Sequence, residues 1–307
     1  MVKHLINIKG KMTGSASRSR RNKIRGQAGE IQRDIRAASI LIEVRDARVP
    51  HLSGMVSFLG KQKTKFRAVV LTKADLACPL VTQSWIEKLN KEGIKAIAVD
   101  LNSGKKDLMK LKNFLKSLAK EKKSAFKLAR FGIVGLPNVG KSTLINRVIG
   151  KTKVRTGDKP GITRGKQWVR VAPDVVILDT PGVIQLFSGL EKQLGEEFFK
   201  LTLCNVVPAG QFCSVTIATE FLAFVVSSFS HWPVKNYFHS LFSSLIEKGD
   251  IETFFDDYSN ENGLLGKGGV PDLAKASVRL VSDFRKGKLG RISLEAPEEY
   301  TGNLWAS

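Results

Sequence analysis

Short runs of apolar and β-branched residues alternate with helical patterns through the first two thirds of the chain. Such runs are typical of strands that are buried on both faces of a parallel sheet. Two further runs, separated by a short polar turn, predict a hairpin. The strands are therefore expected at 38–44, 66–71, 95–99, 131–134, 168–171 and 175–178.

The segments between these runs have the residue spacing of amphipathic helices. Helices are expected at 83–91, 107–123 and 142–149. In the helix expected at 107–123 one face is apolar and the opposite face is basic. The apolar stripe is Leu108, Leu111, Leu115 and Leu118, and the basic stripe is Lys112, Lys116 and Lys120. Strands that alternate with helices predict an α/β fold with a mostly parallel sheet. Beyond residue 189 the pattern becomes mostly helical and ends in polar turns.

A phosphate-binding motif follows the strand expected at 131–134. The stretch 135–143 reads Gly-Leu-Pro-Asn-Val-Gly-Lys-Ser-Thr, a full match to GxxxxGK[ST] between a strand and a helix. The backbone N–H groups of such a loop surround phosphates, and the helix N-terminus adds its dipole. We expect nucleotide contacts from seven residues of this loop, Pro137, Asn138, Val139, Gly140, Lys141, Ser142 and Thr143. Lys141 and Ser142 are expected at a solvent-facing helix start, Lys141 on the phosphates and Ser142 on Mg²⁺.

A switch motif, Asp179-Thr180-Pro181-Gly182, stands at the end of the last predicted strand. A carboxylate at this place holds Mg²⁺ through water, and the Gly182 N–H meets the γ-phosphate. Thr163 precedes the hairpin and is expected to close over Mg²⁺ and the γ-phosphate. The expected Mg²⁺ site is therefore Ser142, Thr163 and Asp179, and the expected catalytic groups are Lys141, Thr163 and Gly182.

The base that the site reads is indicated by a second motif. Guanine differs from adenine by its N1–H and N2–H₂ donors, which one fixed carboxylate accepts together, and in GTPases that carboxylate comes from [NT]KxD. Thr72-Lys73-Ala74-Asp75 directly follows a predicted strand, whereas the downstream candidate Glu247-Lys248-Gly249-Asp250 begins with Glu and lacks one. We expect Thr72, Lys73 and Asp75 to bind GTP, together with the loop that carries Asn102 and Ser103. Since the guanine motif precedes the phosphate loop, the sequence predicts a circularly permuted GTPase fold.

This order of motifs resembles the YlqF/YawG group of circularly permuted GTPases. Four further stretches support the resemblance, Asp46-Ala47-Arg48-Val49-Pro50, Pro160-Gly161-Ile162-Thr163, 268–272 and 284–291. The resemblance implies a GTPase that docks on an immature large ribosomal subunit and leaves after hydrolysis. It also implies that Asn138 helps to hold a K⁺ ion.

The chain departs from that group at two places, near its start and in the stretch 201–230, which matches no stretch of the group. Members carry a GHM-type motif whose His is proposed to assist hydrolysis, whereas the nearest match here is Gly10-Lys11-Met12, so whether Lys11 replaces the His is open. Many GTPases place a water-orienting Gln after the switch Gly, whereas Val183 and Ile184 follow Gly182. We therefore expect slow hydrolysis in the absence of a ribosomal or K⁺ activator.

The charge of the chain indicates a polyanionic partner. Fifty Lys and Arg face 28 Asp and Glu, which gives +22 and a pI near 10.0. The first 190 residues hold 39 basic and 13 acidic residues, and the remainder 11 and 15. This asymmetry predicts a surface for RNA phosphates, which the resemblance implies are those of rRNA, with a merely soluble basic surface as the alternative. Expected contacts come from the lysine stripe and from a basic arm, with Arg18, Arg20, Arg21, Lys23 and Arg25.

The remaining features concern compartment and organisation. Three cysteines without metal-ligand spacing argue against a zinc site and a disulfide framework. We expect a cytoplasmic monomer, although the Ser/Arg-rich start leaves a mitochondrial location open. The apolar stretch 201–230, with Glu220 as its one charge, is expected to form a buried helical core rather than a membrane span. The expected organisation is a basic arm at 1–36, a permuted GTPase domain at 37–190 and a helical domain at 191–307.

Together these features predict a GTP-hydrolysing ribosome assembly factor that binds GTP and GDP, the large ribosomal subunit and rRNA. Two alternatives stay open. One is an RNA-bound, GTP-dependent placeholder with negligible turnover, and the other is a mitochondrial or membrane-associated ribosome GTPase.

Overall fold

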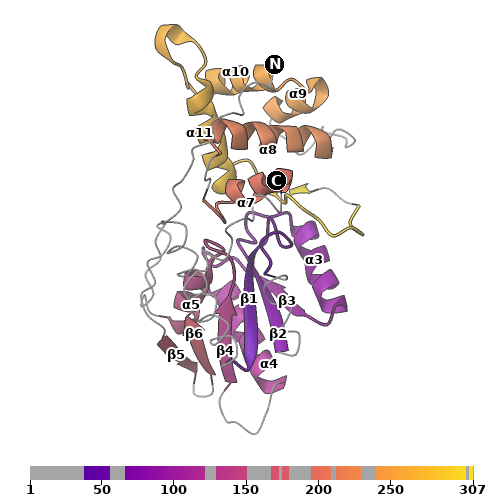
Figure 1. Cartoon of the computed structure of the whole chain (residues 1–307), viewed down its shortest axis with the longest axis vertical. Helices are drawn as coiled ribbons and strands as arrows, with labels where there is room; N and C mark the ends of the chain where they lie inside the picture. The colour runs from indigo at the N-terminus through magenta and orange to yellow at the C-terminus, as the bar shows by residue number, and fades with distance from the viewer. Residues whose placement is uncertain are drawn as a thin grey trace, which may run out of the picture.

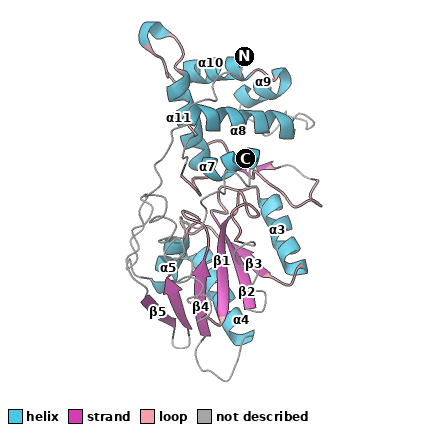
Figure 2. Cartoon of the chain, viewed as in Figure 1, coloured by secondary structure: helices cyan, strands magenta, loops and turns pink. Residues whose placement is uncertain are grey.

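The computed structural model describes residues 38–55, 66–121, 129–150, 167–172, 175–179, 195–208, 212–229, 240–301 and 304–306. A sheet flanked by helices forms one part of the molecule, and a group of helices is stacked at one end of it (Figures 1 and 2). The basic arm expected at 1–36 lies outside the described residues.

The sheet has six strands in the order β3-β2-β1-β4-β6-β5. All neighbours are parallel except the hairpin partners β5 and β6, so the prediction of a mostly parallel sheet is confirmed. Both faces of the central strands are covered, which explains why they appear in the sequence as continuous apolar runs. Their bounds are Ile40–Asp46 (β1), Phe66–Thr72 (β2), Lys95–Ala98 (β3), Ala129–Val134 (β4), Gln167–Ala172 (β5) and Val175–Asp179 (β6).

Helices cover the two faces of the sheet. Helices α4 (Lys105–Glu121) and α5 (Lys141–Ile149) share a buried core with one face, and α3 (Pro79–Lys91) packs on the other. On α4 the predicted stripe is largely confirmed, because three of its four leucines are buried and Leu108 is half-buried. The opposite stripe of Lys112, Lys116 and Lys120 is exposed.

The helical unit contains five α-helices among its described residues. Helix α8 packs against α11, and buried phenylalanines fill the space between the helices, with the Phe221 and Phe284 ring centroids 5.2 Å apart. The apolar stretch that the sequence assigned to a buried core does form one, since Leu201, Phe221 and Val225 are fully buried. Within the described chain, no helix combines the length and apolarity that crossing a membrane requires. The bounds are Phe198–Leu203 (α7), Ser214–Phe229 (α8), Ser240–Lys248 (α9), Ile251–Glu261 (α10) and Leu273–Arg285 (α11), with 3-10 turns at Gly195–Glu197 (η4) and Lys267–Gly269 (η6).

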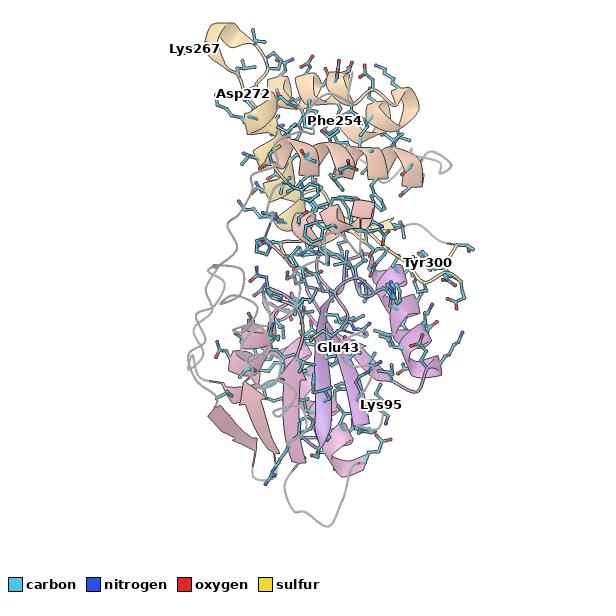
Figure 3. All side chains as sticks on the ribbon, in the orientation of Figure 1. Glu43, Lys95, Phe254, Lys267, Asp272 and Tyr300 are labelled. Atoms are coloured by element: carbon cyan, nitrogen blue, oxygen red, sulfur yellow. The ribbon has the colours of Figure 1, made fainter. Side chains whose placement is uncertain are left out.

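After α11 the chain returns to the sheet part. Strand β7 (Arg291–Ile292) pairs with β8 (Trp305–Ala306), and Tyr300 lies beside α3 (Figure 3). The Trp85 ring nitrogen donates to the Glu295 carbonyl at 3.3 Å. The sequence predicted only polar turns here, whereas the structure has a segment that crosses from the helical unit to the sheet part. The domain boundaries given above stay predictions.

Candidate nucleotide-binding site

The candidate site lies at the carboxyl end of β1, where consecutive strands change from one side of β1 to the other. From β1 the chain proceeds to β2 and β3 on one side and then resumes at β4 on the other side of β1. In open α/β sheets such a switch point creates a crevice at the carboxyl ends of the strands. Three loops meet at this edge: the loop after β1 that begins at Ala47, the guanine-motif loop after β2, and the phosphate-motif loop after β4.

The phosphate-motif loop is folded tightly against β1. A Cβ on Gly135 would approach the Val44 carbonyl oxygen to 2.4 Å, so that only glycine fits. Gly140 caps α5 in the left-handed region, with φ +97°, and Asn138 is exposed with φ +51°. Lys141 is buried rather than solvent-facing, which corrects the expectation from the sequence, and its Nζ donates to the Leu136 carbonyl at 2.6 Å.

Thr72 joins the guanine-motif loop to the end of β1 and to the phosphate-motif loop. Its hydroxyl lies 3.1 Å from the Arg45 carbonyl oxygen and also within hydrogen-bonding distance of the Val139 carbonyl oxygen. The next residue, Lys73, is left-handed with φ +56°, and its Nζ lies 2.8 Å from an Asp46 carboxylate oxygen. Guanine-motif and phosphate-motif residues are therefore adjacent in space although 60 residues or more separate them in sequence.

Asp75 lies beside a second carboxylate. Burial and the neighbouring charge of Asp100 raise the pKa of Asp75 above its ordinary value. Asp100 belongs to the loop after β3, where the Asn102 N–H donates to its carboxylate at 2.7 Å and the Ser103 hydroxyl donates to Asp107 at 2.9 Å. A hollow of about 450 Å³ opens at this point, with Asp75 and Asp100 among its walls.

Asp250, the carboxylate of the downstream candidate motif, lies in the helical unit and not at the switch point. This residue is the N-cap of α10, and its carboxylate accepts from the Glu252 N–H at 3.0 Å and the Thr253 N–H at 3.2 Å. Such a cap satisfies free N–H groups at the helix start. Asp250 thus has a structural role in the helical unit.

The residues expected to bind Mg²⁺ are only partly within the described chain. Asp179 ends β6 and is in register with Ile133 of β4, next to the start of the phosphate-motif loop. Ser142 follows in the first turn of α5. A hydroxyl and a carboxylate at one sheet edge are hard oxygen donors, which suit Mg²⁺. Thr163 and Gly182 lie outside the described residues.

A buried ionic network next to Lys73 was missed in the sequence. Asp46 is fully buried and accepts from Arg48 at 3.0 and 2.8 Å, and Arg48 also donates to the Cys204 carbonyl at 3.0 Å. Arg48 lies 5.2 Å from the centre of the Phe284 ring of α11. Burial alone would raise the pKa of Asp46, but the charges of Arg48 and Lys73 outweigh it and hold that pKa well below its usual range. The motif Asp46-Ala47-Arg48-Val49-Pro50 was the available signal, but it did not reveal burial.

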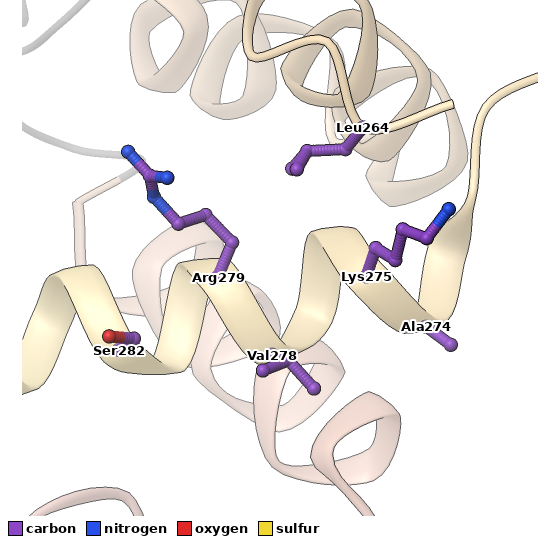
Figure 4. Close-up of a pocket in the computed structure, with 6 residues that line it drawn as sticks. All are labelled: Leu264, Ala274, Lys275, Val278, Arg279 and Ser282. Atoms are coloured by element: carbon purple, nitrogen blue, oxygen red, sulfur yellow. The ribbon is translucent and has the colours of Figure 1, made fainter. Parts of the chain in front are cut away.

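Another hollow, of about 470 Å³, lies in the helical unit, with Leu264, Lys275, Val278 and Arg279 at its walls (Figure 4). No residue of the nucleotide loops lines it. It therefore lies apart from the nucleotide loops.

Comparison with known proteins gives a consistent result. A family model described as "50S ribosome-binding GTPase" matches residues 130–226, which begin at β4 and so exclude the guanine motif that precedes it. The chain is 33% identical to ribosome biogenesis GTPase A of Thermotoga maritima, covering 87% of this chain and 89% of that protein. It is 32% identical to ribosome biogenesis GTPase A of Bacillus cereus, covering 88% and 90%.

Solved structures agree with these relatives. GDP-bound YlqF matches with a TM-score of 0.62 at 30% identity over 88% of this chain and 100% of that one. GNP-bound YlqF from T. maritima matches with a TM-score of 0.58 at 28% identity over 88% and 98%. The prediction of a permuted P-loop GTPase with a helical C-terminal region is confirmed. The chain belongs to the ribosome biogenesis GTPase A family, the YlqF-type GTPases.

Proposed function

We propose that this GTPase acts as an assembly factor of the large ribosomal subunit and contacts rRNA with the basic face of its GTPase part. The observation that carries the proposal is the meeting of the guanine-motif, phosphate-motif and β1 loops at one switch point, in a family named for ribosome biogenesis.

In this proposal each loop has a separate task. The Asp75 carboxylate accepts from N1–H and N2–H₂ of guanine, Lys73 lies along the base and ribose, and Thr72 holds their loop to the phosphate loop. The segment with Asn102 and Ser103 offers a backbone N–H to guanine O6. The residues from Pro137 to Thr143 surround the phosphates with N–H groups, and Lys141 adds a positive charge.

Ser142, Thr163 and Asp179 would hold Mg²⁺, which when bound neutralises charge on the β- and γ-phosphates. Asn138 would help to hold K⁺, and its exposed side chain on the phosphate-motif loop is compatible with that role. Thr163 and Gly182 would position the γ-phosphate for attack by water.

Lys141→Ala tests the phosphate contact. We expect GTP and GDP affinity to fall roughly a hundredfold, because a charge-assisted contact to phosphate is lost. Binding of a fluorescent guanine nucleotide measures the change. Lys275→Ala is the matched control, since Lys275 Nζ also donates to a carbonyl oxygen, that of Leu265 at 2.8 Å, but in the helical unit. Equal affinities for the two variants would contradict a phosphate role of Lys141.

The ribosomal partner is tested by removing the exposed lysine stripe of α4. Phosphate contacts make log K fall with log[salt] by roughly 0.7–0.9 per contact. Replacing Lys112, Lys116 and Lys120 by alanine is therefore expected to reduce the salt slope by roughly 2 and to weaken sedimentation with large subunits. GTP affinity should stay near wild type, because the stripe faces away from the core side of α4.

The matched control removes three lysines that are ion-paired, Lys88 with Glu299, Lys95 with Glu121 and Lys275 with Asp272. It changes the net charge equally, so an equal loss of slope would indicate general charge rather than a binding face. An unchanged slope in the stripe variant would overturn the rRNA assignment to α4. Single-turnover GTP hydrolysis with and without the subunits separates an assembly GTPase from a placeholder with negligible turnover.

A further inference from the structure

We infer that the C-terminal segment 291–295 is a structural part of the guanine-binding site, and that Arg291 is a positioning residue for the loop that carries Asp75. The inference rests on the proposed reading of guanine by Asp75. It assigns a role in nucleotide specificity to residues more than 200 positions away in the sequence.

Arg291 holds the guanine-motif loop at two points. Its Nε donates to the Ala77 carbonyl oxygen at 3.0 Å, and its Nη2 donates to the Ala74 carbonyl oxygen at 2.7 Å. Ala74 immediately precedes Asp75. A planar guanidinium that donates from two nitrogens fixes the orientation of the acceptors as well as their distance.

The next residues of the segment continue this contact. The Ile292 N–H donates to the Leu76 carbonyl oxygen at 3.0 Å, and the Cys78 N–H donates to the Ser293 hydroxyl at 3.2 Å. Four hydrogen bonds therefore join 291–293 to 74–78. Three of the four bonds use the side chains of Arg291 and Ser293, and all four end on backbone groups of 74–78.

The side chain of Asp75 is not held in place by an opposite charge of its own loop. Asp100 faces it as a like charge, and burial and this charge raise the pKa of Asp75. Within the loop, the Leu76 N–H bonds to the Lys73 carbonyl at 3.0 Å, whereas the Ala74 N–H is 3.4 Å from the Val99 carbonyl. The Asp75 N–H and the charge of Arg48 also act on the carboxylate and lower its pKa, but less than burial and Asp100 raise it. The backbone from which the Asp75 side chain starts is held by Arg291 and Ile292. Arg291 and Asp75 also line the same hollow.

The same segment contacts the loop after β1. The Leu294 N–H donates to the Arg48 carbonyl at 2.8 Å, and the Glu295 carboxylate accepts from the His51 and Leu52 N–H groups. Since Asp46, two residues before Arg48, binds Lys73, both functional side chains of the guanine motif are supported from this segment. Asp75 and Lys73 are proposed to contact the base and ribose and not the γ-phosphate. Loss of the segment's contacts should therefore lower the affinities for GDP and GTP alike.

The test compares Arg291→Ala with Arg285→Ala. Arg285 is a matched control, because its Nε and Nη2 also donate to two carbonyl oxygens, those of Leu203 at 2.9 Å and Thr202 at 2.7 Å, within the helical unit. Affinities for GDP and IDP are measured by displacement of a fluorescent GDP. IDP lacks the N2 amine that Asp75 reads, so the ratio of the two affinities reports the position of the carboxylate.

We expect Arg291→Ala to weaken GDP more than IDP, which keeps only the N1–H contact, so that the ratio of GDP to IDP affinity falls about tenfold, and we expect Arg285→Ala to keep the ratio. Thermal unfolding of both variants shows that a general loss of stability does not cause the difference. If Arg291→Ala does not fold, Arg291→Lys is measured, and its ratio should fall less because one donor group remains. A folded Arg291 variant with the wild-type ratio would overturn the inference. A wild-type protein that does not prefer GDP to IDP would overturn the guanine assignment itself.

Discussion

Asp75→Asn is expected to change the preferred nucleotide from GTP to XTP. The carboxylate accepts two hydrogen bonds from guanine, whereas an amide presents a donor that pairs with the 2-carbonyl of xanthine. Leaving a buried donor of the base without an acceptor costs about 1–3 kcal/mol, so GTP affinity should fall roughly a hundredfold. Competition of GTP and XTP against a fluorescent nucleotide measures the exchange.

Asp250→Asn makes the same chemical change at the rival motif. Asn caps helices about as well as Asp, so the variant should keep both its stability and its GTP affinity. Loss of GTP binding in Asp250→Asn, with retention in Asp75→Asn, would contradict the permuted arrangement of the site.

The strands could be predicted from the sequence because burial on both faces leaves a continuous apolar run. Strand β2 was expected at 66–71 and ends one residue later, at Thr72. Helix starts were less accurate. Helix α3 begins at Pro79, four residues before its predicted start. The first turn was missed because it contains a proline and because the apolar side chain of Leu80 is 68% exposed. An exposed leucine obscures the periodicity on which the prediction depended.

The nucleotide loops could be located because GxxxxGK[ST] and [NT]KxD are local motifs with fixed spacing. The support of the guanine motif could not be predicted in the same way. Strand β7 has only two residues, too few to show a period, and its contacts end on backbone groups of 74–78, which leave no trace in the side-chain types of that loop. The burial of Lys141 was missed because it depends on the close approach of Leu136.

The ionic network of Asp46 leads to the second large effect. Asp46→Ala leaves the guanidinium of Arg48 buried, 2% exposed, without its carboxylate. Removing one partner of a buried pair destabilises a protein by about 3–5 kcal/mol. Its neighbours hold the pKa of Asp46 in the folded protein below the usual value of 3.8. The charged form therefore contributes its full stability above pH 3.8. That contribution is lost as the pH falls from 3.8 toward the pKa of the folded state. Urea unfolding at neutral pH is expected to show the full difference.

Asp283→Ala is the matched control for that measurement. Asp283 is also buried and ion-paired, with Arg279 at 2.8 Å, but the Arg279 side chain is 44% exposed and stays hydrated after the change. Its loss should therefore be clearly smaller. Equal losses of unfolding free energy in the two variants would show that burial of Arg48 does not set the cost.

A double variant separates the stabilising role of Asp46 from its role at the nucleotide. In Asp46→Ala/Arg48→Met both buried charges are gone and an apolar side chain fills part of the space, so much of the stability should return. Asp46→Ala is also expected to lower guanine-nucleotide affinity, and this affinity should stay low in the double variant, because Lys73 Nζ still lacks the carboxylate that lies 2.8 Å from it in the wild type. If affinity returned together with stability, Asp46 would serve only the packing of the two parts of the chain. If it did not, Asp46 positions the lysine that lies along the base, and the residues that support nucleotide reading would extend into the contact between the sheet and the helical unit.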